Sequence, residues 1–325
     1  MTLIRSQLIG FGHYLPSKIL TNDDLAQIVE TNDEWIRTRT GIVSRHISDG
    51  ESTSDMAFKA AQMAIQTAGI SVEELDMIIM ATVTPDNTTP SVAAKLSNRL
   101  GAKFGTICMD ISAACSGFVY ALTIVDNMIR LGQVKTALVI GGETISKVLD
   151  WSDRNTCVLF GDAAGAAIVR AGEGNGTAED TGILATKLYA DGSHYDSLKI
   201  TGGVSTTQTA GVINMDGKEV FKFAVNALSQ ASEEVMAMAG VTSEQVDWVL
   251  PHQANIRIIE GVGKKLAVPD EKVIVTVDHH GNTSAASIPI ALSENYQSGR
   301  IKKGDLLVLS AMGAGFTWGG ALVRL

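Results

Sequence analysis

Cys115 stands in the stretch DISAACSGF, Asp110 to Phe118, where serine, alanine and glycine surround it. A cysteine thiolate is a strong nucleophile, so small neighbours would leave it open to a substrate. The stretch follows an apolar run, Ile107 to Ile111, and precedes a helix-like pattern, which places Cys115 at a predicted helix start. Free N–H groups and partial positive charge at such a start favour the thiolate and predict a lowered pKa. A small side chain in a tight core corner is the alternative interpretation.

A histidine and an asparagine occupy comparable positions in the second half of the chain. His252 follows the apolar run Val246 to Leu250, and Asn282 precedes a second stretch of small residues. Polar side chains at strand ends are where α/β proteins place chemistry. A hydrogen-bonded loop histidine and a turn or N-cap asparagine are the structural alternatives. Together with Cys115, the two residues predict a nucleophile with two polar assistants.

The segment MGAGFTWG, Met312 to Gly319, follows a strand-like run and can expose backbone N–H groups to an oxyanion. It is not a dinucleotide fingerprint, because Trp318 stands where the third glycine of GxGxxG is required. The adjacent pair His279 and His280 lacks the spacing of metal ligands, so the sequence predicts no metal site.

Composition excludes several classes of partner. The chain has 325 residues, enough for one large unit or two domains, and it is 45% hydrophobic. A net charge of -9 argues against nucleic acid and anionic membranes as partners. The apolar runs are shorter than the ~18 residues of a membrane helix. Three cysteines without CxxC spacing, after an N-terminus unlike a signal peptide, predict a cytoplasmic protein with reduced thiols.

Strand-like and helix-like segments alternate along the chain, as in α/β proteins. Short apolar runs predict buried strands at 78–84, 136–143, 157–162, 248–253 and 306–313. Amphipathic stretches at 54–69 and 218–240 each close with glycine, the usual helix stop.

The chain also repeats itself weakly at about half its length. SAAC at 112–115 is echoed by SAAS at 284–287, and GAAIVR at 165–170 by GGALVR at 319–324. Two echoes in the same order predict two similar halves that meet near 171–180. The small residues are therefore partly architectural, whereas the thiol is present only in the first half.

Four motifs carry a resemblance to a known family. DISAACSGF, PHQANIRI, HHGNTSAASIP and GAGFTWGGALVR closely resemble those of β-ketoacyl-acyl-carrier-protein synthase III, which starts type II fatty-acid synthesis. The resemblance implies an α/β, thiolase-like fold, with two duplicated halves in a five-layer αβαβα sandwich, and a homodimer. The expected halves are 1–172, with Cys115, and 173–325, with His252 and Asn282.

The resemblance also implies a reaction, a decarboxylative Claisen condensation. An acyl-CoA primer would acylate Cys115, and malonyl-acyl-carrier protein would then bind. His252 and Asn282 would stabilise the enolate formed as carbon dioxide leaves, while backbone N–H groups of Cys115 and Ala314 would hold the oxyanion. The product would be 3-ketoacyl-acyl-carrier protein. No cofactor is implied, because the coenzyme A thioester is a substrate; His252 and the helix dipole are both candidates for assisting loss of the thiol proton.

Coenzyme A contacts follow from the same resemblance. Trp35, Arg39, Arg154 and Asn255 match the family's coenzyme A-binding positions, and an aromatic ring with guanidinium groups suits an adenine base. From the residues alone, core packing is the preferred interpretation of Trp35.

Basic residues predict a docking surface. Arg257, Lys264 and Lys265 share one helix face by their spacing, and Lys222 is counted with them. Such a stripe is ordinarily a solvated helix face. On an acidic chain and beside the candidate site, we interpret it as a dock for an acidic carrier protein.

Three positions depart from the family pattern. Ala314 replaces a common glycine, and His280 stands where an aromatic residue is common. Thr89 matches a position where some members carry phenylalanine, and the resemblance implies that it would lie at the end of the acyl pocket, reached across the dimer. We hypothesise that the smaller threonine admits primers longer than acetyl.

Alternative functions remain open at this point. Synthase-III-like enzymes of polyketide or quinolone biosynthesis share the same three residues, and a cysteine hydrolase acting on thioesters also uses Cys, His and Asn. A thiolase is disfavoured, because it needs a second catalytic cysteine and the chain has none after Cys157.

Overall fold

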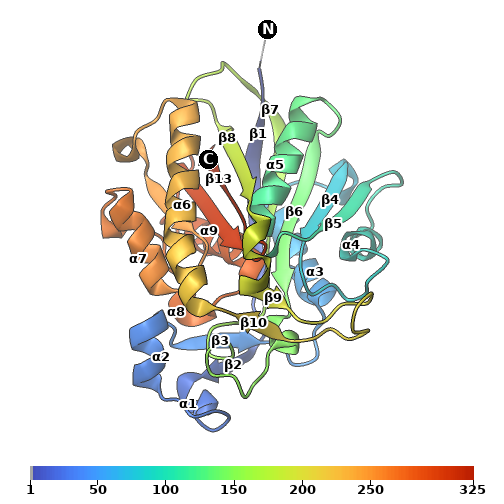
Figure 1. The fold of residues 1–325 in the computed structure, drawn as a ribbon. Coiled ribbons are helices and arrows are strands. Elements are labelled where there is room, and N and C mark those ends of the chain that lie inside the picture. Colours follow the sequence, from blue (N-terminus) through green and yellow to red (C-terminus); the bar gives the residue numbers. More distant parts are fainter. Residues whose placement is uncertain (1–2) are drawn as a thin grey trace.

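The fold is built on two sheets, seen in a computed structural model that describes residues 3–325 (Figure 1). The first sheet has the order β1-β7-β6-β4-β5 and the second the order β11-β12-β13-β8. The first comprises β1 (Leu3–Tyr14), β4 (Met77–Ala81), β5 (Ile107–Ile111), β6 (Thr136–Glu143) and β7 (Ala163–Gly174). The second comprises β8 (Gly182–Ala190), β11 (Trp248–Pro251), β12 (Leu306–Gly313) and β13 (Thr317–Arg324). In each sheet, parallel strands are joined to an antiparallel pair.

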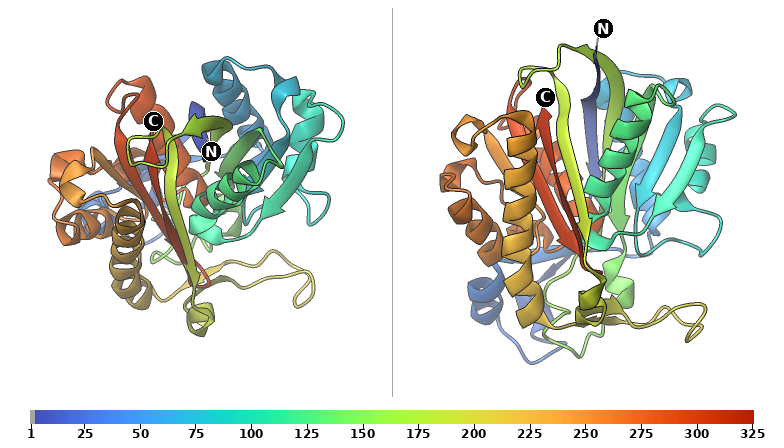
Figure 2. Two further views of the ribbon diagram at one scale, coloured as in Figure 1. Left: turned by 90° about the horizontal axis from the view of Figure 1, so that it is seen from above. Right: turned by 45° about the horizontal axis from the view of Figure 1, so that its top comes forward.

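Helices separate and cover the two sheets. They are α1 (Asn22–Leu25), α2 (Asp33–Thr40), α3 (Thr53–Ala68), α4 (Val92–Leu100), α5 (Gly117–Arg130), α6 (Gly217–Ala239), α7 (Ile256–Lys265), α8 (Val277–His280) and α9 (Ser287–Gln297). Helices α5 and α9 contact both sheets, whereas α3 and α4 cover the outer face of the first and α6 and α7 that of the second (Figure 2). The predicted five-layer αβαβα sandwich is therefore confirmed.

The middle layer contains one of the main hydrophobic cores. Phe118 and Leu122 of α5 pack with Ile288 and Leu292 of α9, between apolar residues of both sheets. Burying large side chains from both halves in a single core contributes about 1.5–3 kcal/mol for each. The starts of α5 and α9, where the candidate residues lie, are fixed by this packing.

Two short ribbons complete the fold. Strands β2 (Lys18–Thr21) and β3 (Ser44–Ile47) pair, as do β9 (Leu198–Ile200) and β10 (Ile213–Met215). The loop joining β9 to β10 projects beyond the two sheets (Figure 2). None of the helices within residues 3–325 is both long and apolar enough to cross a membrane.

The sequence located most of these elements. Runs 136–143 and 306–313 coincide with β6 and β12, and 54–69 and 218–240 match α3 and α6 within one residue. The strand expected at 157–162 is wrong, because this segment is a buried turn in which the Cys157 N–H donates to Asp153 O at 3.0 Å. The residues of this segment are apolar because they are buried in the core, although they do not form a strand.

The duplication is real, but its register differs from the sequence echo. Strand β6 begins at Thr136 and β12 at Leu306, and the short turns before α5 and α9 span Ala114–Ser116 and Ser284–Ala286. Ala114 and Ser284 both have positive φ, 46° and 52°. The two turns therefore correspond at an offset of 284 − 114 = 170, which pairs Cys115 with Ala285 rather than with Ser287. The predicted boundary at 172 falls near the end of β7, and the division itself remains a prediction.

Candidate active site

Cys115 lies in the turn between β5 and α5, where two hollows of the surface meet. The first has an apolar wall and includes Ser284 and Ala314; the second includes His252 and Asn282. The apolar lining of the first consists of Val83, Ile145, Phe160, Leu198, Ile200 and Ile213. Residues from both halves are thus brought around one sulfur, as the sequence predicted for Cys115, His252 and Asn282.

Gly313 explains how the halves approach so closely. A Cβ atom on this residue would lie 2.5 Å from the backbone nitrogen of Cys115 and 3.0 Å from the Ala114 Cβ. Only glycine fits there, at the end of β12. The adjacent Ala314 lines the same hollow as Cys115. Its departure from the family glycine imposes no left-handed backbone, because it is not among the non-glycine residues with positive φ within 3–325.

The environment of Cys115 corrects the expectation of a thiolate. Burial raises the pKa of the thiol, the Ser284 hydroxyl and a backbone N–H lower it, and the Glu143 carboxylate raises it, so that the net value is about 11. Although the residue keeps some exposed surface, burial of the thiol is the largest influence on its pKa. The helix start stabilises a thiolate by less free energy than the thiolate loses when it is removed from water. Cys115 is therefore a thiol before the reaction begins.

His252 is held as a neutral imidazole directly after β11. Burial lowers its pKa to about 3, and its Nδ1 lies 2.7 Å from the Ser287 Oγ. The Gln253 N–H donates to the same oxygen at 3.3 Å, which leaves the serine hydroxyl free to donate to Nδ1. We assign the ring proton to Nε2 on this network, so that His252 presents a hydrogen-bond donor.

Asn282 is oriented by backbone contacts on both sides. Its side-chain Oδ1 accepts from the backbone N–H of Ser284 at 2.8 Å, and its backbone N–H donates to Leu159 O at 2.8 Å. With Oδ1 engaged, Nδ2 is the atom available to a ligand in the hollow. The side chain is 7% exposed, and it lines the hollow that also contains Cys115 and His252.

Glu143 is a buried carboxylate that the sequence analysis missed. It ends β6 with no exposed surface, and it accepts from Thr82 Oγ1 at 3.0 Å, Thr84 Oγ1 at 2.6 Å and Ser284 Oγ at 3.3 Å. Burial raises its pKa to about 7 despite these donors. An acidic residue at the end of a fully buried, apolar strand is unusual, and this pattern is visible in the sequence.

Glu143→Gln should make Cys115 more reactive, because it removes a negative charge that raises the thiol pKa. The carboxyl ionises at a pH of about 7, so we expect faster alkylation than in the parent above this pH and equal rates below it. A several-fold rise at pH 8.5 is expected, damped by the lower nucleophilicity of a less basic thiolate. Alkylation by iodoacetamide, followed against pH, measures this, with Glu233→Gln on exposed α6 surface as control. Equal rates at every pH would contradict it.

Trp35, Arg39, Arg154 and Asn255 come together beside α2 and α7. The guanidinium carbons of Arg39 and Arg154 lie 4.6 and 5.2 Å from the Trp35 ring centroid. Asn255 caps α7 by accepting from the Arg257 N–H at 2.9 Å and donates to Arg39 O at 3.1 Å. Trp35 is only partly buried and packs against a hydrophobic core, so both interpretations of this residue describe part of its setting.

The basic residues lie on neighbouring helices. Lys222 belongs to α6 and Arg257, Lys264 and Lys265 to α7, and all four are exposed. The Arg257 guanidinium carbon lies 5.4 Å from the centroid of Phe221, which lines the hollow containing His252.

Thr89 is exposed and borders a separate hollow. That hollow shares Val83 and Ser112 with the lining around Cys115, but Thr89 itself does not line the latter. Within one chain, the apolar wall near Cys115 is formed by other residues. The reach of Thr89 across a dimer remains a prediction.

Comparison with known proteins finds one family along the chain. Profiles of "3-Oxoacyl-[acyl-carrier-protein (ACP)] synthase III" and of its C-terminal part match residues 109–192 and 236–325. The chain is 57% identical to β-ketoacyl-[acyl-carrier-protein] synthase III of Rhodospirillum centenum, over 99% of each. The 3-oxoacyl-[acyl-carrier-protein] synthase III structure from Aquifex aeolicus has a TM-score of 0.92 at 49% identity, covering 98% and 100% of the chains. A priming β-ketosynthase from the R1128 polyketide pathway gives 0.92 at 33%, covering 100% and 98%.

Proposed function

This chain belongs to the β-ketoacyl-acyl-carrier-protein synthase III family, and on that premise we propose the steps by which it performs the initiating condensation of fatty-acid synthesis. It is an acyltransferase of the condensing class. One observation supports these steps. The thiol of Cys115 and two neutral hydrogen-bond donors, the imidazole of His252 and the amide of Asn282, line the same hollow. An acyl-CoA and malonyl-acyl-carrier protein are the proposed substrates.

Acylation of Cys115 is the first proposed step. The sulfur attacks the thioester carbonyl of acyl-CoA, a C–S bond to Cys115 forms, and the C–S bond to coenzyme A breaks. The thiol proton leaves with coenzyme A as its own thiol. Backbone N–H groups of Cys115 and Ala314 would stabilise the oxyanion. A pKa of about 3 makes His252 a weak base, so it is not the preferred acceptor of this proton.

Condensation is the second step. Carbon dioxide leaves the malonyl group, and the electrons of the broken C–C bond form a thioester enolate. Nε2–H of His252 and Nδ2–H of Asn282 donate to its oxygen, which stabilises the developing charge in a site of low polarity. The enolate carbon attacks the acyl carbonyl, the C–S bond to Cys115 breaks, and the released thiolate takes a proton from solvent. Its raised pKa of about 11 favours that return.

Substrate entry is proposed along the second hollow. Asn255, which caps α7, lines this hollow together with His252. Trp35, Arg39 and Arg154 lie beside α7. The two guanidinium groups near the Trp35 ring offer an aromatic and cationic surface for the adenine and phosphate groups of coenzyme A.

Arg257→Glu should weaken carrier-protein binding. The exposed cation lies beside the hollow that holds His252, and its reversal places a negative charge before an acidic partner. We expect KM for malonyl-acyl-carrier protein to rise at least tenfold at low salt, with little change in the acylation of Cys115 by acyl-CoA. Lys18→Glu, on exposed surface of β2, is the control. Equal loss in both steps would refute this docking surface.

A homodimer is proposed on the exposed edge of the first sheet. Strand β5 ends that sheet, and all five of its residues, Ile107 to Ile111, keep part of their surface exposed. An apolar edge strand is a template for pairing with another chain, and a second copy supplies a matching strand. Thr89 borders this region, in the hollow that includes Asp110 and Ile111.

Product analysis tests the function. The protein is incubated with an acyl-CoA and then with malonyl-acyl-carrier protein, and carbon dioxide, free acid and 3-ketoacyl product are measured. We expect carbon dioxide and 3-ketoacyl-acyl-carrier protein in equal amounts. Release of free acid from acyl-CoA alone would support the hydrolase instead. The priming ketosynthase of polyketide synthesis is the second candidate, favoured by the R1128 likeness, and it predicts transfer to a carrier other than that of fatty-acid synthesis.

A further inference from the structure

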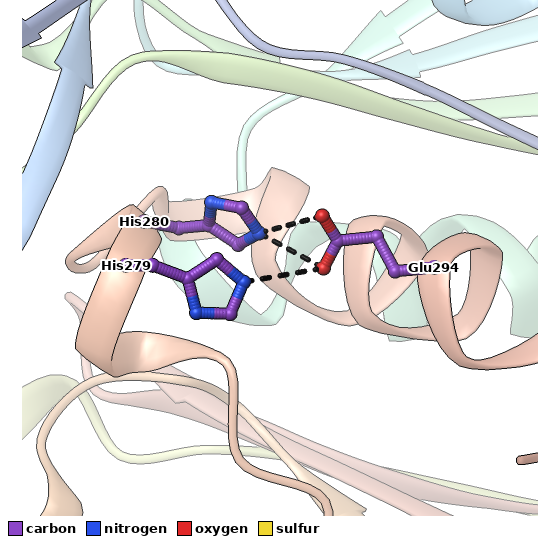
Figure 3. A group of neighbouring side chains, drawn as sticks. All are labelled: His279, His280 and Glu294. Atoms are coloured by element: carbon purple, nitrogen blue, oxygen red, sulfur yellow. Dashed lines mark hydrogen bonds and ion pairs between the residues drawn. The ribbon is translucent and has the colours of Figure 1, made fainter. Parts of the chain in front are cut away.

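Four of the six histidines of the chain gather around one carboxylate, Glu294 of α9. His279 and His280, at the end of α8, point their rings toward it (Figure 3). The His46 ring centroid lies 5.8 Å from that of His280, and Nδ1 of His13 lies 2.9 Å from Oγ of Ser293, the neighbour of Glu294. Burial lowers the pKa of both His13 and His46, which keeps these rings uncharged. None of these residues has a part in the proposed reaction.

The distances in this cluster suit a metal ion. Nε2 of His280 lies 2.9 Å from both carboxylate oxygens of Glu294, and Nε2 of His279 lies 3.7 Å from Oε2. Ligand atoms of the three residues all lie within 4.8 Å of one another. Two ligands on a tetrahedral zinc ion, each at ~2.1 Å, are about 3.4 Å apart. The observed spacings bracket that value, so small side-chain rotations suffice.

The second ring nitrogen of His279 and the exposure of the cluster also favour metal binding. Nδ1 of His279 lies 2.8 Å from the Asp278 carboxylate, which holds a proton on Nδ1 and leaves Nε2 as the ligand atom. The side chain of His280 is 4% exposed, that of Glu294 24% and that of His279 48%, so one side is open for entry and for a solvent ligand.

We propose that His279, His280 and Glu294 form a binding site for a divalent transition metal of the zinc class. The ligands are Nε2 of each histidine and the Glu294 carboxylate, with a solvent molecule in the fourth position. The expectation of no metal site rested on the adjacency of the two histidines. It overlooked Glu294, which the turn at Gly281 and the start of α9 bring back onto them.

A metal ion at this site would connect two helices that flank the segment of Asn282. It joins the end of α8 to α9, on either side of the segment 281–286 that carries Asn282. A bound ion would therefore hold both flanks of this segment. An ion pair between protonated His279 and Glu294 is the competing account of the same contacts. Metal must displace this proton, so the affinity should fall as pH decreases from 8 to 6.

Zinc titration of the metal-free full chain tests the proposal. A Cys115→Ala background removes the thiol as a competing ligand. We expect one Zn²⁺ per chain by calorimetry, a rise in Tm, and weaker binding at pH 6 than at pH 8. His279→Gln, at a half-exposed position, should weaken binding at least tenfold, and Glu294→Gln likewise.

His194→Gln, outside the cluster, is the matched control and should bind as the parent does. Co²⁺ should give the visible bands of a tetrahedral N/O site, lost in His279→Gln. Binding unchanged in His279→Gln, or no stoichiometric binding by the parent, would overturn the site and leave the ion pair as the full account. The readouts are independent of the condensation reaction.

Discussion

Cys115→Ala should abolish the acyl adduct and lower the condensation rate by at least about 10³-fold, because the Cys115 thiol forms the covalent intermediate of the proposed reaction. Intact-protein mass spectrometry after addition of acyl-CoA is the measurement. The parent should gain the mass of one acyl group, and malonyl-acyl-carrier protein should discharge it. The variant should gain none, since the thiol is the only nucleophile on the shared lining of the two hollows.

Two controls separate chemistry from folding. Cys108→Ala removes another partly exposed cysteine, on β5, and should keep the adduct and the activity. Cys115→Ala itself should still release carbon dioxide from malonyl-acyl-carrier protein, because His252 and Asn282 remain in place. An adduct on the alanine variant, or activity near that of the parent, would refute the role of Cys115.

The sequence allowed the fold to be predicted through local patterns and internal repetition. Apolar runs located β6 and β12, and glycines at 69 and 240 marked the ends of α3 and α6, where both have positive φ. The echo of SAA found the duplication but misaligned it by two residues, because small residues recur along both turns. The two halves share the backbone conformation of these turns, in which Ala114 and Ser284 are both left-handed.

The electrostatics of the site could not be predicted from local sequence. A helix start lowers the pKa of a thiol, but the net direction depends on how much protein surrounds the sulfur. That protein comes from the other half of the chain, through Ser284 and the turn at Gly313. Glu143 and Ser287 were missed for the same reason: each acts on a partner more than 30 residues away, across a layer boundary.

His252→Ala and Asn282→Ala should each reduce the condensation rate by ~10²–10³-fold, the usual cost of one oxyanion donor. Both donate to the same enolate oxygen in the proposed reaction, and neither is needed to form the acyl thioester. Acylation of Cys115 should therefore proceed at nearly the parent rate. Single-turnover measurements of adduct formation and of carbon dioxide release separate the two steps.

The double variant distinguishes a shared role from two separate ones. If both donors act on one transition state, the loss in the double variant should be smaller than the product of the single losses. Ser287→Ala provides a graded test, because it removes the hydroxyl that lies 2.7 Å from Nδ1 of His252 but leaves the ring. It should slow carbon dioxide release less than His252→Ala does, and it should leave acylation intact. Acylation lost in parallel with condensation would place His252 and Asn282 in the first step and reverse the proposed division of labour.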